Sequence, residues 1–162
     1  MNGRSHGIAT KIASPTVGLA VGYATGDVGL AVAAALGTAL GLIIDPDMDC
    51  NSTLAQMNAS RWRMMQLWRP VGYLWFALWY PYGVSFSHRG VSHTPIIGTA
   101  TRLLYLAIFP SMLAVVLAAA GVDVASPLAA TADWVARHNN YFIVAIIGLS
   151  LSDIIHWAMD KV

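Results

Sequence analysis

Charged residues are scarce in this sequence. Of its 162 residues, 10% are charged and 57% are hydrophobic, and the mean hydropathy is +0.60. Soluble domains carry about 25% charged residues, so these few charges would not cover the surface of a soluble domain of this length. The composition excludes a disordered chain and a protein that coats nucleic acid. It predicts an integral membrane protein whose surroundings are lipid.

Glutamate is absent and cysteine is nearly so. All eight acidic residues are Asp, so carboxylate chemistry depends on aspartate alone. The single cysteine, Cys50, excludes an internal disulfide, which leaves packing, lipid or a metal to stabilise the fold. Internal repeats, low-complexity tracts and flexible linkers are also lacking. We therefore predict a single membrane-embedded domain over residues 1–162.

Four apolar stretches are candidates for transmembrane helices, because a bilayer core of about 30 Å needs roughly 20 helical residues. Lys11, early in the first stretch, can extend to the interface, and Pro110 should kink the third. In the second, Gly37 and Gly41 have the four-residue spacing that lets membrane helices approach closely. The stretches are residues 8–24, 28–44, 94–121 and 141–159. The predicted fold class is all-α, a membrane bundle of about four transmembrane helices.

The segment between the second and third stretches, residues 45–93, is rich in tryptophan and arginine. Trp and Tyr favour the headgroup level of a membrane, so an interfacial belt explains the tryptophans better than a ligand-binding box. Residues 70–86 are apolar but interrupted by Pro81 and Gly83. We expect an interfacial or re-entrant helix there, broken near these two positions. A fifth membrane crossing is the alternative.

The four predicted crossings place most basic residues on one side of the membrane. Seven of the nine Lys and Arg residues fall on the side of the amino terminus, Arg137 falls on the other side, and Arg102 lies inside the membrane. By the positive-inside rule, the amino-terminal side is cytoplasmic. The regions of Asp45 and His88 and the end of the last helix fall on this same side. If residues 70–86 crossed, the His88 region would move to the opposite face.

Four groups of His and Asp residues are candidates for chemistry on that side. Asp153 and His156 are spaced i, i+3, so they share a helix face, as in bundles that present a carboxylate and an imidazole to a metal. His88 and His93 are too far apart for one face of a regular helix, but Gly90 permits a bend between them. The candidates are His6; Asp45, Asp47 and Asp49; His88 and His93; and Asp153 and His156.

This mixture of side chains predicts a transition-metal site. Imidazole nitrogens combined with carboxylate oxygens suit zinc, manganese or iron(II) better than calcium or magnesium. Three His and two or three Asp exceed one tetrahedral site, so we expect two ions about 3.5 to 4 Å apart that activate water against a phosphoryl or acyl group. Arg89, between two candidate histidines, is the predicted catalytic residue, since it can hold a phosphate and offset charge in the transition state.

Each candidate also has an ordinary structural explanation. His6 near a terminus can simply be solvated, and the other loop residues can form a polar helix stop or a surface loop. Asp153 and His156 are harder to explain this way, because ionisable groups late in an apolar helix are costly and usually functional. We interpret Arg102 as the partner of a buried Asp or as extending to the interface, and His138 as an ordinary residue of the opposite face. We favour the metal hypothesis, because the ordinary explanations require four separate groups of residues to fall on one side of the membrane by coincidence.

The order of these motifs resembles a family of uncharacterised metal-binding membrane proteins, grouped with membrane-bound metal-dependent hydrolases that include members regulated by the bacterial DNA-damage repressor. The specific part is the block His88-Arg89-Gly90-Val91-Ser92-His93. The other matching pieces are Gly3-Arg4-Ser5-His6, Pro46-Asp47-Met48-Asp49, Thr94-Pro95-Ile96-Ile97-Gly98-Thr99 and Asp153-Ile154-Ile155-His156. More distantly, the pattern is similar to zinc-dependent phospholipase C enzymes. The resemblance implies a bacterial-type inner membrane protein with metal ligation by His6, Asp47, Asp49, His88, His93, Asp153 and His156, and it leaves the role of Asp45 open.

Two functions from different classes stay open. The first is a membrane-bound metal-dependent hydrolase at the cytoplasmic headgroup level, cleaving a phosphoester or related bond of a lipid or lipid-linked substrate. The second is a non-catalytic subunit in which metal joins loop to helix, while Gly-rich faces pack against partner proteins or another copy of the chain. An open coordination position facing a groove favours the enzyme, and a shell filled by protein ligands favours the subunit. An ion or proton pathway is weaker, because the polar residues stop on one side apart from Arg102.

Overall fold

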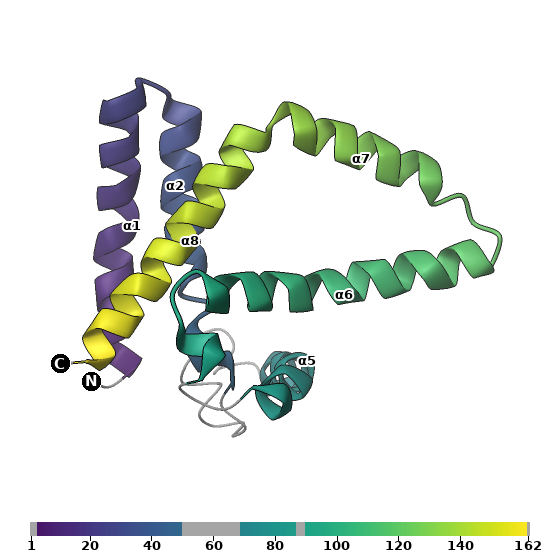
Figure 1. The fold of residues 1–162 in the computed structure, drawn as a ribbon, viewed down its shortest axis with the longest axis horizontal. Helices are drawn as coiled ribbons and strands as arrows, with labels where there is room; N and C mark the ends of the chain where they lie inside the picture. Colours follow the sequence, from purple (N-terminus) through teal and green to yellow (C-terminus); the bar gives the residue numbers. More distant parts are fainter. Residues whose placement is uncertain (1–2, 50–68, 87–89, 162) are drawn as a thin grey trace.

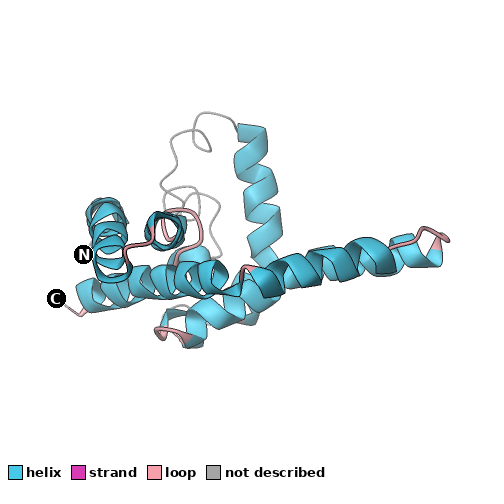
Figure 2. Cartoon of the chain, turned by 90° about the horizontal axis from the view of Figure 1, so that it is seen from above, coloured by secondary structure: helices cyan, strands magenta, loops and turns pink. Residues whose placement is uncertain are grey.

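A computed structural model describes residues 3–49, 69–86 and 90–161 of the chain. This part contains six α-helices, two short 3-10 helices and no strand, which confirms the predicted all-α class (Figures 1 and 2). The elements are α1 (Gly3–Thr25), α2 (Val28–Leu40), η1 (Pro46–Asp49), α5 (Arg69–Ser85), η2 (Val91–His93), α6 (Ile97–Ala119), α7 (Ala125–Arg137) and α8 (Asn139–Asp160).

Helices α6 and α8 are long and apolar enough to cross a membrane. Helix α2 is shorter than the predicted stretch over residues 28–44, because it ends at Leu40 after 13 residues, or about 20 Å. Beyond that point the turn tightens, and Leu42 and Ile43 donate to carbonyls three residues back, at 2.9 Å each. The prediction of one uninterrupted helix to Ile44 was therefore wrong.

Helices α1, α2 and α8 pack side by side through very small residues (Figure 1). A Cβ added at Gly37 would lie 2.0 Å from the Ala145 carbonyl oxygen of α8. A Cβ added at Gly41 would lie 2.0 Å from the Ser152 hydroxyl, so the two glycines permit a close crossing of α2 and α8. The prediction made from their spacing is confirmed. This packing fixes the carboxyl end of α8 next to the amino end of α1.

Helix α5 carries the aromatic segment and packs against the first half of α6. Trp79 and Tyr82 are fully buried, and Tyr82 shares a 2.9 Å hydrogen bond with the Thr101 hydroxyl. The predicted break near Pro81 was wrong, since the helix continues to Ser85. A proline removes one helical hydrogen bond. The helix stays intact because Trp79 and Tyr82, close to the proline, are buried against α6. Burial of Trp79 also means that this tryptophan is a core residue and does not belong to an interfacial belt.

A strained turn joins η2 to α6. The third apolar stretch was expected to begin its helix at Thr94, but α6 begins at Ile97. Ile96 has φ 69° and ψ −54°, and the Ile97 amide donates to the Pro95 carbonyl at 2.8 Å, which defines a γ-turn with a positive φ. A β-branched residue rarely adopts this conformation. The turn redirects the chain so that η2 can lie beside α8.

Helix α7 was not predicted. It connects α6 to α8 on the side of the molecule opposite both termini (Figure 1). None of the residues of α7 is buried. Asp123 precedes it and accepts hydrogen bonds from the amides of Ala125 and Ser126, at 3.0 and 3.2 Å. The Ser126 hydrogen bonds hold the pKa of this carboxyl below its ordinary value. The sequence signal was missed because residues 122–140 are too polar to register as an apolar stretch.

Candidate metal centre

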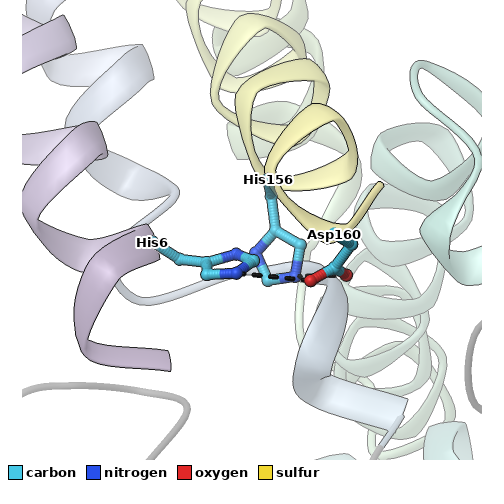
Figure 3. A group of neighbouring side chains, drawn as sticks. All are labelled: His6, His156 and Asp160. Atoms are coloured by element: carbon cyan, nitrogen blue, oxygen red, sulfur yellow. Dashed lines mark ion pairs between the residues drawn. The ribbon is translucent and has the colours of Figure 1, made fainter. Parts of the chain in front are cut away.

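Four elements bring His and Asp side chains together at one end of the fold. The amino end of α1 supplies His6, η1 supplies Asp47, η2 supplies His93, and the carboxyl end of α8 supplies His156 and Asp160. In Figure 3, His6 and His156 lie close together with Asp160 beside them. All three imidazoles are at least 93% buried, so their nitrogens are withdrawn from water.

The donor atoms of these five residues form a chain of short contacts. His6 Nε2 lies 3.3 Å from one oxygen of Asp160, and His156 Nε2 lies 3.5 Å from the other. His156 Nε2 is also 3.5 Å from Asp47 Oδ1, and His93 Nε2 is 3.4 Å from the same oxygen. Typical N–H···O hydrogen bonds are shorter, about 2.7 to 3.2 Å.

These separations fit the edges of a metal coordination shell. Two ligand atoms that each lie about 2.1 Å from a tetrahedral zinc ion are about 3.4 Å apart. The four contacts of 3.3 to 3.5 Å match that edge. Buried imidazoles together with carboxylates are also the donor set that zinc, manganese and iron(II) accept. The residues present therefore fit a transition metal.

His156 belongs to both groups of donors in this cluster. One group is His6, His156 and Asp160, the other is Asp47, His93 and His156, and within each group the donor atoms lie within 4.8 Å of one another. A neutral imidazole nitrogen has one lone pair, so Nε2 of His156 serves one ion at a time. Among the described residues, a second ion would have to rely on the remaining donors.

Asp47 is held in its ionised form. Burial of this carboxyl favours the neutral acid, but hydrogen bonds and electrostatic interactions with His156 and His93 outweigh that effect and hold its pKa well below the usual range. Asp45, whose role the sequence left open, is 1% exposed and accepts a 3.1 Å hydrogen bond from the Asp47 amide. This Asx-type contact shapes the turn that presents Asp47.

The Asp153 side chain on α8 pairs with two residues of α6. Its Oδ2 accepts hydrogen bonds from Arg102 and from the Thr99 hydroxyl, both on α6, and it belongs to neither donor group. Arg102 also donates to the Ser92 carbonyl at 2.9 Å, next to His93. The interpretation of Arg102 as the partner of a buried Asp is confirmed. A ligand role for Asp153 stays a prediction, since its Oδ1 is buried with no hydrogen-bond partner among the described residues.

Three predicted site residues lie outside the described part of the chain. These are His88 and Arg89, together with the side chain of Asp49. Asp160, in contrast, was missed. It lies four residues after His156 on the same helix face, a spacing as informative as the i, i+3 pair that was noticed. The predicted helix ended at residue 159, which placed this carboxylate outside the helix.

A pocket of about 200 Å³ adjoins the donors. It is lined by Gly90, His93, Thr94, Trp157, Asp160 and Lys161. His93 and Asp160 thus belong to the donor cluster and also line an open space. The cluster is accessible from this side, whereas its imidazoles are covered from the others.

The geometry agrees with the family to which the sequence is similar. A family described as "Uncharacterized metal-binding protein (DUF2227)" matches residues 1–162. The chain belongs to this family. An uncharacterized protein of Aquifex aeolicus (strain VF5) is 31% identical over 72 residues, which is 44% of this chain and 42% of that protein. The match thus spans less than half the length of that relative. No solved structure matches the chain. Its membership of a metal-binding family confirms that part of the resemblance.

Proposed function

We propose that this protein is an integral membrane metal-dependent hydrolase that cleaves a phosphoester or related bond of a lipid or lipid-linked substrate. The observation that carries the proposal is the pocket that shares His93 and Asp160 with the buried donor cluster. A metal used only to hold the fold together needs no access from outside. A catalytic metal needs an open position for substrate or water.

His6, Asp47, His93, His156 and Asp160 would hold the metal. Zinc is the ion we expect, with manganese or iron(II) as alternatives. A bound transition metal supplies a Lewis acid that polarises a phosphoryl oxygen and lowers the pKa of water. Asp47 stays ionised beside two histidines, which suits a carboxylate that binds a metal. A second ion would need donors beyond the shared His156, a role that the sequence gives to Asp49, His88 and Asp153.

The apolar helices support a membrane location. Only 6% of the most apolar window of α6 and 28% of that of α8 are buried within the chain, which supports apolar surroundings for both helices. We extend this to a bundle of about four transmembrane helices in a bacterial-type inner membrane, with the metal site on the cytoplasmic side as the basic residues indicate. Lipid would cover the exposed apolar faces, or a second copy or a partner subunit would do so.

One observation favours a second candidate function. The five donors come from four separate elements and join the two ends of the described fold. A metal bound there would stabilise the folded chain strongly, as in structural zinc sites. The alternative is therefore a non-catalytic, metal-stabilised membrane subunit that packs against partner proteins.

Metal content and hydrolysis measured together test the proposal. Purified protein should hold at least one equivalent of a transition metal, and H93A and D160A should lose it, while H138A at the far end of α8 should keep it. Phospholipids and lipid-linked phosphates are then screened for cleavage with zinc or manganese present. Turnover that H138A retains and H93A lacks supports the enzyme. Metal binding without turnover of any phosphate ester would favour the structural subunit, and full metal retention by H93A and D160A would refute the shared site.

A further inference from the structure

The pocket beside the donor cluster contains a cation that the metal site does not use. Lys161 lines it together with His93, Asp160 and Trp157. The ammonium lies 5.5 Å from the centroid of the Trp157 ring, within the range of a cation–π contact. The ring therefore supports the lysine at the edge of the pocket and does not neutralise its charge.

The electrostatics of this pocket depend on the metal. Without an ion, the Asp160 carboxylate and the carbonyl end of α8 both repel an anion, and Lys161 opposes them from among the described residues that line the pocket. A divalent cation held by either donor group reverses that balance, because Asp160 belongs to one group and His93 to the other. The pocket then presents two positive centres to a ligand, which suits a phosphoryl group better than a neutral or cationic one.

Exposed apolar residues occur close in sequence to the residues that line the pocket. Val91 follows Gly90 and is 52% exposed, Ile96 lies two residues after Thr94 and is 64% exposed, and Trp157 in the pocket wall is 43% exposed. A volume of about 200 Å³ is smaller than the roughly 300 to 1,000 Å³ of pockets that enclose whole drug-sized ligands. It suits a headgroup whose apolar tail remains outside, against these exposed side chains.

We propose that this pocket is the substrate subsite for a phosphoryl group carried on an apolar tail, with Lys161 as its cationic anchor next to the metal donors His93 and Asp160. This inference rests on the proposed hydrolase function and adds the residue that selects an anionic substrate. Lys161 binds and orients the phosphoryl group, and the exposed apolar residues beside the pocket receive the tail. Binding requires the metal as well as the lysine.

Phosphate binding by the full chain in a neutral detergent tests the subsite without measuring turnover. Zinc-loaded protein is titrated with inorganic phosphate, with short-chain phosphatidic acid and with short-chain diacylglycerol. We expect phosphatidic acid to bind more tightly than inorganic phosphate and diacylglycerol to bind weakly. K161Q should weaken binding of both phosphates about ten-fold with unchanged zinc content, since one charge-assisted hydrogen bond is lost. K161R should retain most of the affinity, and R137Q, which removes a distant exposed cation, should behave like the wild type.

Several results would overturn the inference while leaving the metal site intact. Equal phosphate affinity in K161Q and the wild type would remove Lys161 from the subsite. Equal affinity for inorganic phosphate and phosphatidic acid would remove the apolar tail from the proposal. Phosphate binding that persists after chelation of zinc would show that the metal plays no part in it. In contrast, loss of zinc binding by H93A together with an unchanged phosphate affinity in K161Q would support the proposed metal site and refute only this subsite.

Discussion

Replacing Arg102 by methionine would leave the Asp153 carboxylate buried without its charged partner. The two side chains are 0% and 3% exposed and form a direct ion pair. Removing one partner of such a pair costs about 3 to 5 kcal/mol, because the remaining charge is neither solvated nor paired. The same substitution releases the Ser92 carbonyl, which lies beside His93. We therefore expect R102M to lower the free energy of unfolding in mild detergent by about 3 kcal/mol or more.

The double variant R102M/D153L separates a buried charge pair from a metal ligand. Replacing both partners by apolar residues removes the unpaired charge, so stability should return to within about 1 to 2 kcal/mol of the wild type. If Asp153 serves only to clamp α6 to α8, the double variant keeps its metal. If Asp153 is a ligand, the double variant folds but loses metal. These outcomes are read by denaturant unfolding and by metal analysis of the same preparations.

The exposed pair Arg137 and Asp133 provides a matched control. It joins residues four apart on α7, with side chains 63% and 58% exposed. An exposed pair of this kind contributes about 0 to 1 kcal/mol, so R137M should change stability little. A loss of under 1 kcal/mol in R102M, or equal losses in R102M and R137M, would refute the argument from burial.

Three further predictions concern packing, the strained turn and the metal. G37A should destabilise the chain by about 1 to 3 kcal/mol, since its Cβ would lie 2.0 Å from the Ala145 carbonyl oxygen. G22A, whose Cβ would lie 3.1 Å from Ala31 Cβ, should destabilise it less. Thermal unfolding compares the two variants, and equal losses of stability would contradict the close crossing of α2 and α8. I96G should stabilise by about 1 kcal/mol by relieving the positive φ, and a clear loss of stability in denaturant unfolding would contradict the strain. Metal affinity should fall as pH decreases from neutral, because protons compete for the imidazoles while Asp47 stays ionised. The affinity should recover when the pH returns to neutral. Metal content that is independent of pH would exclude histidine ligation.

The elements predicted best were those whose signal is local. Long apolar runs predicted α6 and α8, and a four-residue glycine spacing predicted the close approach of α2. The errors arose where a distant contact or a backbone conformation decides the outcome. Helix α5 continues through Pro81 because α6 packs against its aromatic residues, and α6 begins late because Ile96 adopts a positive φ. Neither cause is visible in the composition of the segment concerned.

In the candidate site too, local signals predict some residues correctly, while distant contacts decide the role of others. His6, Asp47, His93 and His156 were predicted from residue type and position, and the structure brings their donor atoms together. Asp153 has the same local signal as His156, but Arg102, 51 residues away in sequence, occupies its Oδ2. A carboxylate late in an apolar helix can be balanced by a metal or by a buried arginine, and the choice depends on which cation the neighbouring helix supplies.

The arginine also links the fold to the site. Arg102 on α6 holds Asp153 on α8 and the Ser92 carbonyl of η2, so one side chain connects the helix that carries His156 to the turn that carries His93. Two candidate metal donors that are 63 positions apart in sequence are thereby held relative to each other without an ion. Preorganised donors bind metal without the cost of ordering two separate segments at the moment of binding. A buried charge pair adds little to stability compared with apolar residues in the same two positions. The pair would then be retained because it positions the ligands.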